Sequence, residues 1–383
     1  MDDFEHLADD LEADITKLGH DATVKGSSIS DWIRQVDSQS QLIRLSVCRA
    51  VHDLLWTSGR AGFGEEHQTA SLMGHLASQI GWYGRIFAAE AAASGAEFTL
   101  PDIRWAHQEK RQEANTGVDF GLLCNPSGDN NEDTEVRLVL LQAKLASSGK
   151  EEIEYFSVNH KTGQRGKLTK EEIRSALNSH WFRLCLKEAV LDHFKDNRAS
   201  RPEKIAAALT KYPAGLPRYQ LESLLRTQFK LAAMGKVDGP WCLYAVLRRP
   251  TPEQSPPPPL AVPLGVVANH LHERNVWCFP LPNKIPLIDN GEPCHELIAV
   301  LATALGYDAS PYGLRLRLSQ VTDAVGQACE LLPSLSFVTS SPSESGGLAL
   351  AHAIKSGFRV SPSLPQPRPL PQPAPTQRNP RSR

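Results

Sequence analysis

The sequence has few of the patterns that organise small secreted proteins or membrane proteins. Its seven cysteines are scattered along 383 residues, and none stands in a Cys-x-x-Cys spacing that would indicate a zinc site or a disulfide framework. We expect reduced thiols, most of them packed in the core. No apolar run approaches the roughly 18–20 residues that span a bilayer. The acidic start MDDFEHLADDLEAD also lacks the basic and apolar regions of a secretory signal. The sequence therefore predicts a cytoplasmic protein.

Charges of both signs are present but unevenly placed. Hydrophobic residues make up 41% of the chain and charged residues 22%, which is typical of a soluble globular protein with a large core. Residues 196–236 contain eight Lys or Arg and three acids, whereas the first fourteen residues contain seven acids and no Lys or Arg. This segregation could serve a polyanionic ligand, but charge runs are more often simply solvated faces, so charge alone decides nothing.

Apolar periodicity and the placement of Pro, Gly and Ser divide the chain into segments. The expected organisation is an N-terminal helical segment (1–60), a central α/β domain (61–250) with a polar, helix-leaning insertion (146–216), a Pro-rich linker (251–259), a smaller accessory α+β module (260–338) and a disordered tail rich in Pro, Ser and Arg (339–383). Within the accessory module we expect strands in LGVVANHLHERNVWCFPL and helices in HELIAVLATALG and SQVTDAVGQACELL.

Within the central domain the periodicity changes from helical to strand-like near residue 101. A helix is expected from Glu66 to about Ala93, followed by strands in IRWAHQEKRQEANTGVD, FGLLCN and VRLVLLQAKLA. The turn-like PSGDNNEDTE separates the last two strands and predicts a hairpin. RYQLESLLRTQFKLAAMGK is then an amphipathic helix, and WCLYAVLRR a short apolar strand.

Three polar residues interrupt the apolar pattern of the two hairpin strands. Asp119 stands inside strand 116–125, and a buried carboxylate loses more solvation than it recovers unless the fold supplies a partner or a metal. Gln142 and Lys144 point to one face of strand 136–145, because alternate residues of a strand share a face. If the hairpin forms, the three side chains converge, and a divalent cation would account for the aspartate.

The helix that begins at Glu66 adds a second acid. Its apolar stripe lies on nearly the same face as Glu66 and consists of Thr69, Met73, Leu76, Ile80, Tyr83 and Phe87. Glu66 is therefore expected to point inward, whereas Glu65, rotated by about 100 degrees, should be more exposed. An acid at this place is also explained by its favourable interaction with the helix N-terminus.

Together, these elements resemble the PD-(D/E)xK nuclease superfamily, and within it the Mrr-like restriction endonucleases, whose motif takes a QxK form. The resemblance covers roughly residues 60–250. It implies a restriction-endonuclease-like mixed sheet flanked by helices. Two residues depart from the motif: Val118 stands where its name has proline, and Gln142 stands where most members carry a second acid. A neutral amide oxygen is a poorer ligand for Mg²⁺ than a carboxylate.

The resemblance implies a DNA endonuclease that depends on Mg²⁺ or Mn²⁺ and acts in restriction or anti-phage defence. Asp119, the Gln142 side chain, the Ala143 carbonyl and Glu66 would hold the metal, which offsets charge on the phosphate and lowers the pKa of bound water. Lys144 would orient the attacking water or stabilise the transition state.

Further residues are candidates for supporting roles. Glu113 and Gln220 could lie close to the same site. The basic residues Arg218, Arg226 and Lys230 on or next to the amphipathic helix could contact the DNA backbone. By analogy alone, the accessory module would recognise a sequence, a protein partner or a second copy of the chain.

Other interpretations stay open. In an unrelated α/β domain, Asp119 and Lys144 would form a buried ion pair, and a nuclease fold without catalysis would be a DNA-binding or protein-interaction subunit. The HLH at 270–272 could present two imidazoles, but surface or core histidines explain it better. PQPRPLPQP could bind a partner domain, although most such tails are linkers.

Overall fold

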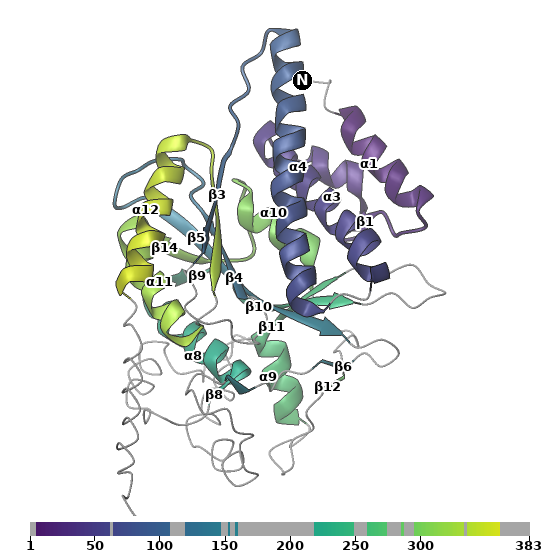
Figure 1. Ribbon diagram of the computed structural model, residues 1–383. Coiled ribbons are helices and arrows are strands. Elements are labelled where there is room, and N and C mark those ends of the chain that lie inside the picture. The colour runs from purple at the N-terminus through teal and green to yellow at the C-terminus, as the bar shows by residue number, and fades with distance from the viewer. Residues whose placement is uncertain are drawn as a thin grey trace, which may run out of the picture.

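A mixed β-sheet runs through the middle of the molecule, with helices against both of its faces (Figure 1). The mixed α/β class expected from the sequence is therefore confirmed. This computed structural model describes residues 5–61, 64–107, 119–146, 152–153, 158–159, 218–248, 259–273, 285–286, 295–332 and 335–360. Each face of the sheet has its own hydrophobic core.

Nine strands form this sheet in the part of the chain that the structure describes. Seven of them lie in the order β13 (His295–Glu296), β11 (Leu260–Pro263), β10 (Cys242–Arg248), β5 (Glu135–Ala146), β4 (Asp119–Cys124), β15 (Ser336–Ser341) and β3 (Asp102–His107). Off this path, β14 (Leu314–Arg317) pairs with the first residues of β5, and β9 (Lys236–Val237) pairs with β14. Separate two-stranded pairs are β1 (Thr23–Val24) with β2 (Ser27–Ser28), β6 (Glu152–Ile153) with β12 (Ile285–Pro286), and β7 (Val158–Asn159) with β8 (Arg218–Tyr219).

Strand direction changes along the sheet. β4 and β5 are antiparallel, as the predicted hairpin requires, and β10 is parallel to β5 and antiparallel to β11. β15 comes from the C-terminal part of the chain yet lies between β3 and β4, parallel to β4 and antiparallel to β3. Parallel neighbouring strands must be joined by a long crossover connection. The sheet therefore pairs segments that are far apart in the sequence.

The central strand β5 contributes to both cores. Val136, Leu138 and Leu140 belong to one core, whereas Val139 and Leu141 belong to the other. Alternate residues of a strand point to opposite faces, so a strand covered on both faces reads as a continuous apolar run. This explains the sequence VRLVLL and makes the polar residues that follow it conspicuous.

One face of the sheet is covered by the N-terminal helices and one later helix. These are α1 (Glu5–Lys17), α2 (Ile29–Arg34), α3 (Ser38–Ala61), α4 (Glu65–Ser94) and α10 (Leu297–Leu305). α4 ends at Gly95, whose φ of 70° is the left-handed conformation common just beyond a helix. The helices predicted within residues 1–60, from Glu66 to about Ala93 and in HELIAVLATALG are confirmed.

The other face is covered by α8 (Gln220–Ala232), α9 (Leu264–Glu273), α11 (Leu318–Leu331) and α12 (Glu344–Val360). α11 and α12 lie side by side over one half of the sheet (Figure 1). α8, α11 and the strand β10 confirm the predictions for RYQLESLLRTQFKLAAMGK, SQVTDAVGQACELL and WCLYAVLRR. Among the described helices, none is both long and apolar enough to cross a membrane.

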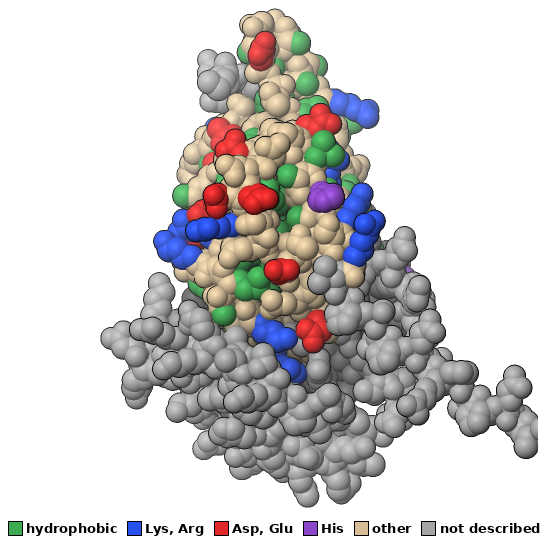
Figure 2. Space-filling model, turned by 90° about the vertical axis from the view of Figure 1, so that its left-hand side faces the viewer, with side chains coloured by type: hydrophobic (Ala, Val, Ile, Leu, Met, Phe, Trp, Pro, Cys, Tyr) green, Lys and Arg blue, Asp and Glu red, His purple; other side chains and the backbone are tan. Residues whose placement is uncertain are grey.

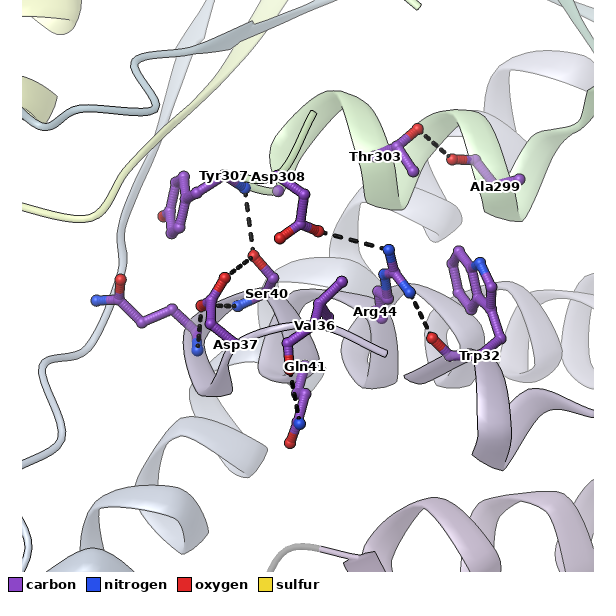
Figure 3. A network of polar contacts seen from close by, with 12 residues as sticks. Trp32, Val36, Asp37, Ser40, Gln41, Arg44, Ala299, Thr303, Tyr307 and Asp308 are labelled. Atoms are coloured by element: carbon purple, nitrogen blue, oxygen red, sulfur yellow. Dashed lines mark hydrogen bonds and ion pairs between the residues drawn. The ribbon is translucent and has the colours of Figure 1, made fainter. Parts of the chain in front are cut away.

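A polar network fixes α3 against the end of α10 (Figure 3). Asp37, directly before α3, accepts hydrogen bonds from the amide of Ser40 at 3.0 Å and from its hydroxyl at 2.9 Å. The same hydroxyl accepts a hydrogen bond from the Tyr307 amide at 3.3 Å. Arg44 pairs with Asp308 at 3.4 Å. Because α10 packs on β4, this network ties the N-terminal helices to the sheet.

The structure differs from the expected organisation after residue 259. β11, β13, β14 and β15 belong to the same sheet as β4 and β5, so the described strands of 260–338 are part of the central domain rather than of a separate module. α9 occupies LGVVANHLHE, which was expected to be strand-rich. Short apolar runs do not distinguish a buried strand from a buried helix. The insertion 146–216 and the linker 251–259 lie almost entirely outside the described residues.

The helix α12 lies inside 339–383, where the sequence predicts disorder, and that prediction is wrong over Glu344–Val360. Leu350 and Ile354 are fully buried against the sheet. The segment ESGGLALAHAIKSGFRV begins with Ser and Gly, which are weak helix formers, but its apolar residues form one face of a helix. Packing of that face on the sheet stabilises the helix.

Candidate functional site

The β4–β5 hairpin brings the two predicted strands of the site into register. Asp119 lies directly opposite Gln142, and the pairing continues to Cys124 opposite Arg137. The turn that follows β4 is held by Asn125, whose side chain accepts a hydrogen bond from the Gly128 amide at 3.0 Å and donates one to the Asp129 carbonyl at 2.7 Å. Gly128 has a φ of 75°, which favours glycine.

Gln142 is fully buried, and neither polar atom of its side chain has a hydrogen-bond partner in the part of the chain that the structure describes. On its other side, Gln142 lies beside Tyr244 in the parallel strand β10. Burial of an unpaired amide costs about 1–3 kcal/mol. Unpaired polar groups of this kind are rare in cores and indicate strain, a missing ligand or a functional role.

Two residues further along β5, Lys144 is also buried, with 6% of its surface exposed. Its ammonium lies 3.8 Å from Oε1 of Glu65, in the first turn of α4, and the Glu65 side chain is 23% exposed. Oε2 of Glu65 accepts a hydrogen bond of 3.1 Å from the Leu145 amide. The end of β5 therefore carries a buried amide and a buried ammonium two residues apart, and the ammonium lies next to a carboxylate of α4.

The sequence predicts that Glu65 is more exposed than Glu66; in the structure the Glu65 side chain is 23% exposed and reaches Lys144 and the β5 backbone. The described pairing of β4 with β5 ends at Asp119 opposite Gln142. Leu145 lies three residues beyond this last pair, and its amide donates to the Glu65 carboxylate. The side chain of Glu66 lies outside the described residues. The apolar stripe of α4 alone does not decide which of two adjacent acids in the first helical turn reaches the sheet. The contact of Glu65 with Lys144 was therefore not predicted from the sequence.

Several predicted site residues are placed only in part. The structure gives the backbone but not the side chain of Asp119, Gln220 and Arg218. Val118 and Glu113 lie outside the described residues. Gln142 and Lys144 stand two residues apart in β5, as predicted.

The basic residues of α8 are not free to form the surface that the sequence predicts. Arg226 is buried, with 4% of its surface exposed, and the ammonium of Lys230 lies 3.4 Å from Oε2 of Glu330 on α11. The face over α11 and α12 shows Lys and Arg interspersed with Asp and Glu rather than gathered (Figure 2). α8 packs its amphipathic face on the sheet, and Arg226 goes into the core with it.

The histidines expected as a weak alternative are on a helix rather than a strand. His270 and His272 fall in α9, where residues two apart do not share a face. In the described residues, no group of three or more His, Cys, Asp or Glu side chains could hold a metal ion. Among the described residues, Cys48, Cys124, Cys242 and Cys329 are buried and form no disulfide, in agreement with the expectation of packing thiols.

The oxygen donors at the end of β5 still suit a hard cation. The Gln142 amide oxygen is buried and unpartnered within the described structure, the Glu65 carboxylate is close to Lys144, and the β4 register brings the backbone of Asp119 beside Gln142. Hard divalent cations prefer such oxygen ligands.

No known protein family, curated protein or solved structure matches this chain. Interpretation of the site therefore depends on its own residues and their surroundings.

Proposed function

We propose that this protein is a Mg²⁺- or Mn²⁺-dependent DNA endonuclease of the PD-(D/E)xK type, acting in restriction or anti-phage defence. One observation carries the proposal: Asp119 lies directly opposite Gln142, and two residues later the buried Lys144 meets a helix-borne glutamate. Opposite residues of an antiparallel pair belong to one face of the sheet. We therefore expect the Asp119 carboxylate on the Gln142 side.

The order of the elements supports this proposal. α4 supplies the glutamate, β4 the aspartate and β5 the Gln-x-Lys pair, and then come the helix α8 and the short strand β10. β10 lies beside β5 and parallel to it, so its Tyr244 neighbours Gln142. These five elements follow the order that the resemblance implies for residues 60–250, with β3 between α4 and β4 and the short strands β6 to β9 between the others.

The residues at the end of β5 have complementary roles in the proposed reaction. Asp119, Gln142, the Ala143 carbonyl and a helix glutamate would hold the cation. The cation, when bound, supplies positive charge against the phosphate and lowers the pKa of its bound water. The carboxylate and amide oxygens have no proton to donate, so they would face the metal. The positively charged groups would face the phosphate.

Lys144 and Glu65 act as a pair in this proposal. The Lys144 ammonium is a compact positive charge that can orient a water or meet the charge that grows on the phosphate. Glu65 holds it at 3.8 Å and is itself fixed by the Leu145 amide. A buried ammonium without a carboxylate beside it would be costly, so Glu65 compensates the Lys144 charge and directs it.

Plasmid cleavage tests the proposal. Supercoiled plasmid is incubated with Mg²⁺ or Mn²⁺ and the wild-type chain, Lys144→Ala or Asp119→Ala. Lys236→Ala, at an exposed lysine of β9, is the matched control. We expect nicking or linearisation by the wild type and the control only, with no cleavage in EDTA. Cleavage that survives both site substitutions would exclude this site assignment.

A second function is favoured by one specific observation. Gln142 stands where most members of the resembling superfamily carry a second acid, so the fold could instead serve as a non-catalytic DNA-binding or protein-interaction subunit. In that case the wild type binds DNA or a partner but leaves plasmid intact with every divalent cation. The two functions are thus separated by the same assay, followed by a gel-shift measurement in EDTA.

A further inference from the structure

A depression of about 400 Å³ lies on the surface between α3 and α4, away from the end of β5. It is lined by Arg49 of α3 and by Ser78, Gln79, Trp82 and Tyr83 of α4. Ser78 and Trp82 are four positions apart, as are Gln79 and Tyr83, so the four residues share one side of the helix. The volume falls within the range of about 300–1,000 Å³ that small-molecule sites occupy.

Trp82 presents an unusually accessible aromatic ring at this depression. It is 62% exposed, which is the largest value among the exposed large apolar side chains in the described residues. Its neighbour Tyr83 is half-buried, and burial raises the pKa of the Tyr83 hydroxyl. An indole ring beside a concavity offers a flat apolar surface on which another planar group can stack.

The polar side chains that line the depression, Arg49 and Gln79, are fixed by contacts with neighbouring carboxylates. Nε of Arg49 lies 3.1 Å from Oδ1 of Asp53, and its NH1 lies 3.3 Å from Oδ2 of Asp14. Nε2 of Gln79 donates a hydrogen bond of 2.8 Å to Asp53. Two acids thus surround one guanidinium, so the depression offers no excess positive charge to a free anion such as phosphate.

We propose that this depression binds a nucleobase, stacked on Trp82 and hydrogen-bonded along its edge by Ser78, Gln79 or Arg49. A nucleobase is planar, uncharged and bordered by donors and acceptors, which matches an exposed indole next to fixed amide and guanidinium groups. Trp82 follows Glu65 by about 25 Å along α4 at 1.5 Å per residue. The site is therefore distinct from the residues of the proposed cleavage reaction and does not depend on it.

Saturation-transfer NMR with adenosine tests this proposal. Adenosine carries no phosphate, and EDTA removes any metal, so cleavage activity has no part in the result. We expect transfer of saturation from the protein to the base protons for the wild type and for Trp82→Phe, which keeps an aromatic ring. Binding should weaken about tenfold in Trp82→Ala. Trp56→Ala, at an exposed tryptophan of α3 that does not line the depression, should behave as wild type.

A second variant keeps the test decisive if Trp82→Ala fails to fold. Ser78→Leu fills the depression from an exposed position and should also abolish the transfer, while its circular dichroism stays that of the wild type. Equal transfer in the wild type, Trp82→Ala and Ser78→Leu would overturn the proposal. So would the absence of any transfer at millimolar adenosine, or transfer to maltose but not to adenosine, since sugars also stack on indole rings.

Discussion

The Lys144 ammonium lies 3.8 Å from Oε1 of Glu65, and this contact joins the central strand β5 to the start of α4. It brings the carboxylate of Glu65 to the Gln-x-Lys pair, whereas the sequence predicts that role for Glu66, whose side chain lies outside the described residues. The choice between two adjacent glutamates is therefore open to experiment.

Glu65→Gln should impair plasmid cleavage more than Glu66→Gln does. The amide of the variant still accepts a hydrogen bond from Leu145 but no longer pairs with the Lys144 charge. Loss of a partner that orients a catalytic group typically costs roughly 10–100-fold. Initial rates of nicking in Mg²⁺ measure the effect. A larger loss in Glu66→Gln would return the role to Glu66.

Gln142→Leu should stabilise the fold by about 1 kcal/mol, because it replaces an amide that is buried without a partner in the described structure. It should at the same time abolish metal-dependent cleavage. Urea denaturation gives the free energy of unfolding. The matched variant is Gln41→Leu, where Nε2 donates to the Val36 carbonyl at 2.8 Å, and this variant should lose stability. Destabilisation by Gln142→Leu would mean that the amide is satisfied in solution.

Asp37→Ala should lower the free energy of unfolding by about 1 kcal/mol at neutral pH, since Asp37 caps α3 through the Ser40 amide and hydroxyl. Burial alone would raise the pKa of Asp37, but hydrogen bonds, first from Ser40 and then from Asp308 and Gln39, lower it below its usual range. Asp37 therefore stabilises the fold fully above the pKa of an unfolded aspartate, and this contribution is lost as the pH falls through the lower pKa of the folded state.

The expected signature of Asp37→Ala is convergence with the wild type in acid. Urea denaturation from pH 7 to pH 3 measures the difference between the two proteins at each pH. Asp129→Ala, at an exposed acid of the β4–β5 turn, serves as the control and should stay close to wild type. A difference that stays constant with pH would show that the carboxylate charge is not what caps the helix.

Gly121→Ala should destabilise the sheet by about 1–3 kcal/mol, because a Cβ there would lie 2.4 Å from Cε1 of Phe337 on the neighbouring strand β15. Phe337→Leu in the same chain should recover part of the loss, which a double-mutant cycle of denaturation midpoints measures. Gly74→Ala, on the open side of α4 with nothing within 4 Å, should instead be neutral or stabilising. Additive effects of the substitutions at 121 and 337 would argue against the clash.

The local parts of the fold could be predicted from the sequence, whereas long-range strand placement could not. The alternation around Leu140, Leu141 and Gln142 predicted which residues share a face, and the turn after Cys124 predicted the hairpin. Nothing local indicates that Ser336–Ser341 lies between β3 and β4, because that pairing is decided by packing of residues more than two hundred positions apart. For the same reason, the burial of Arg226 was missed: a basic residue on an amphipathic helix is ordinarily solvated.

The place of β15 has a consequence for biosynthesis. β4 obtains its partner on one side only when the chain has been made as far as Ser341, long after the ribosome has released the hairpin that carries Asp119 and Gln142. Until then one edge of β4 has unpaired amides and carbonyls, which other chains could join. Completion of the C-terminal strand thus closes that edge, and a chain interrupted at the Pro-rich stretch would expose it to aggregation.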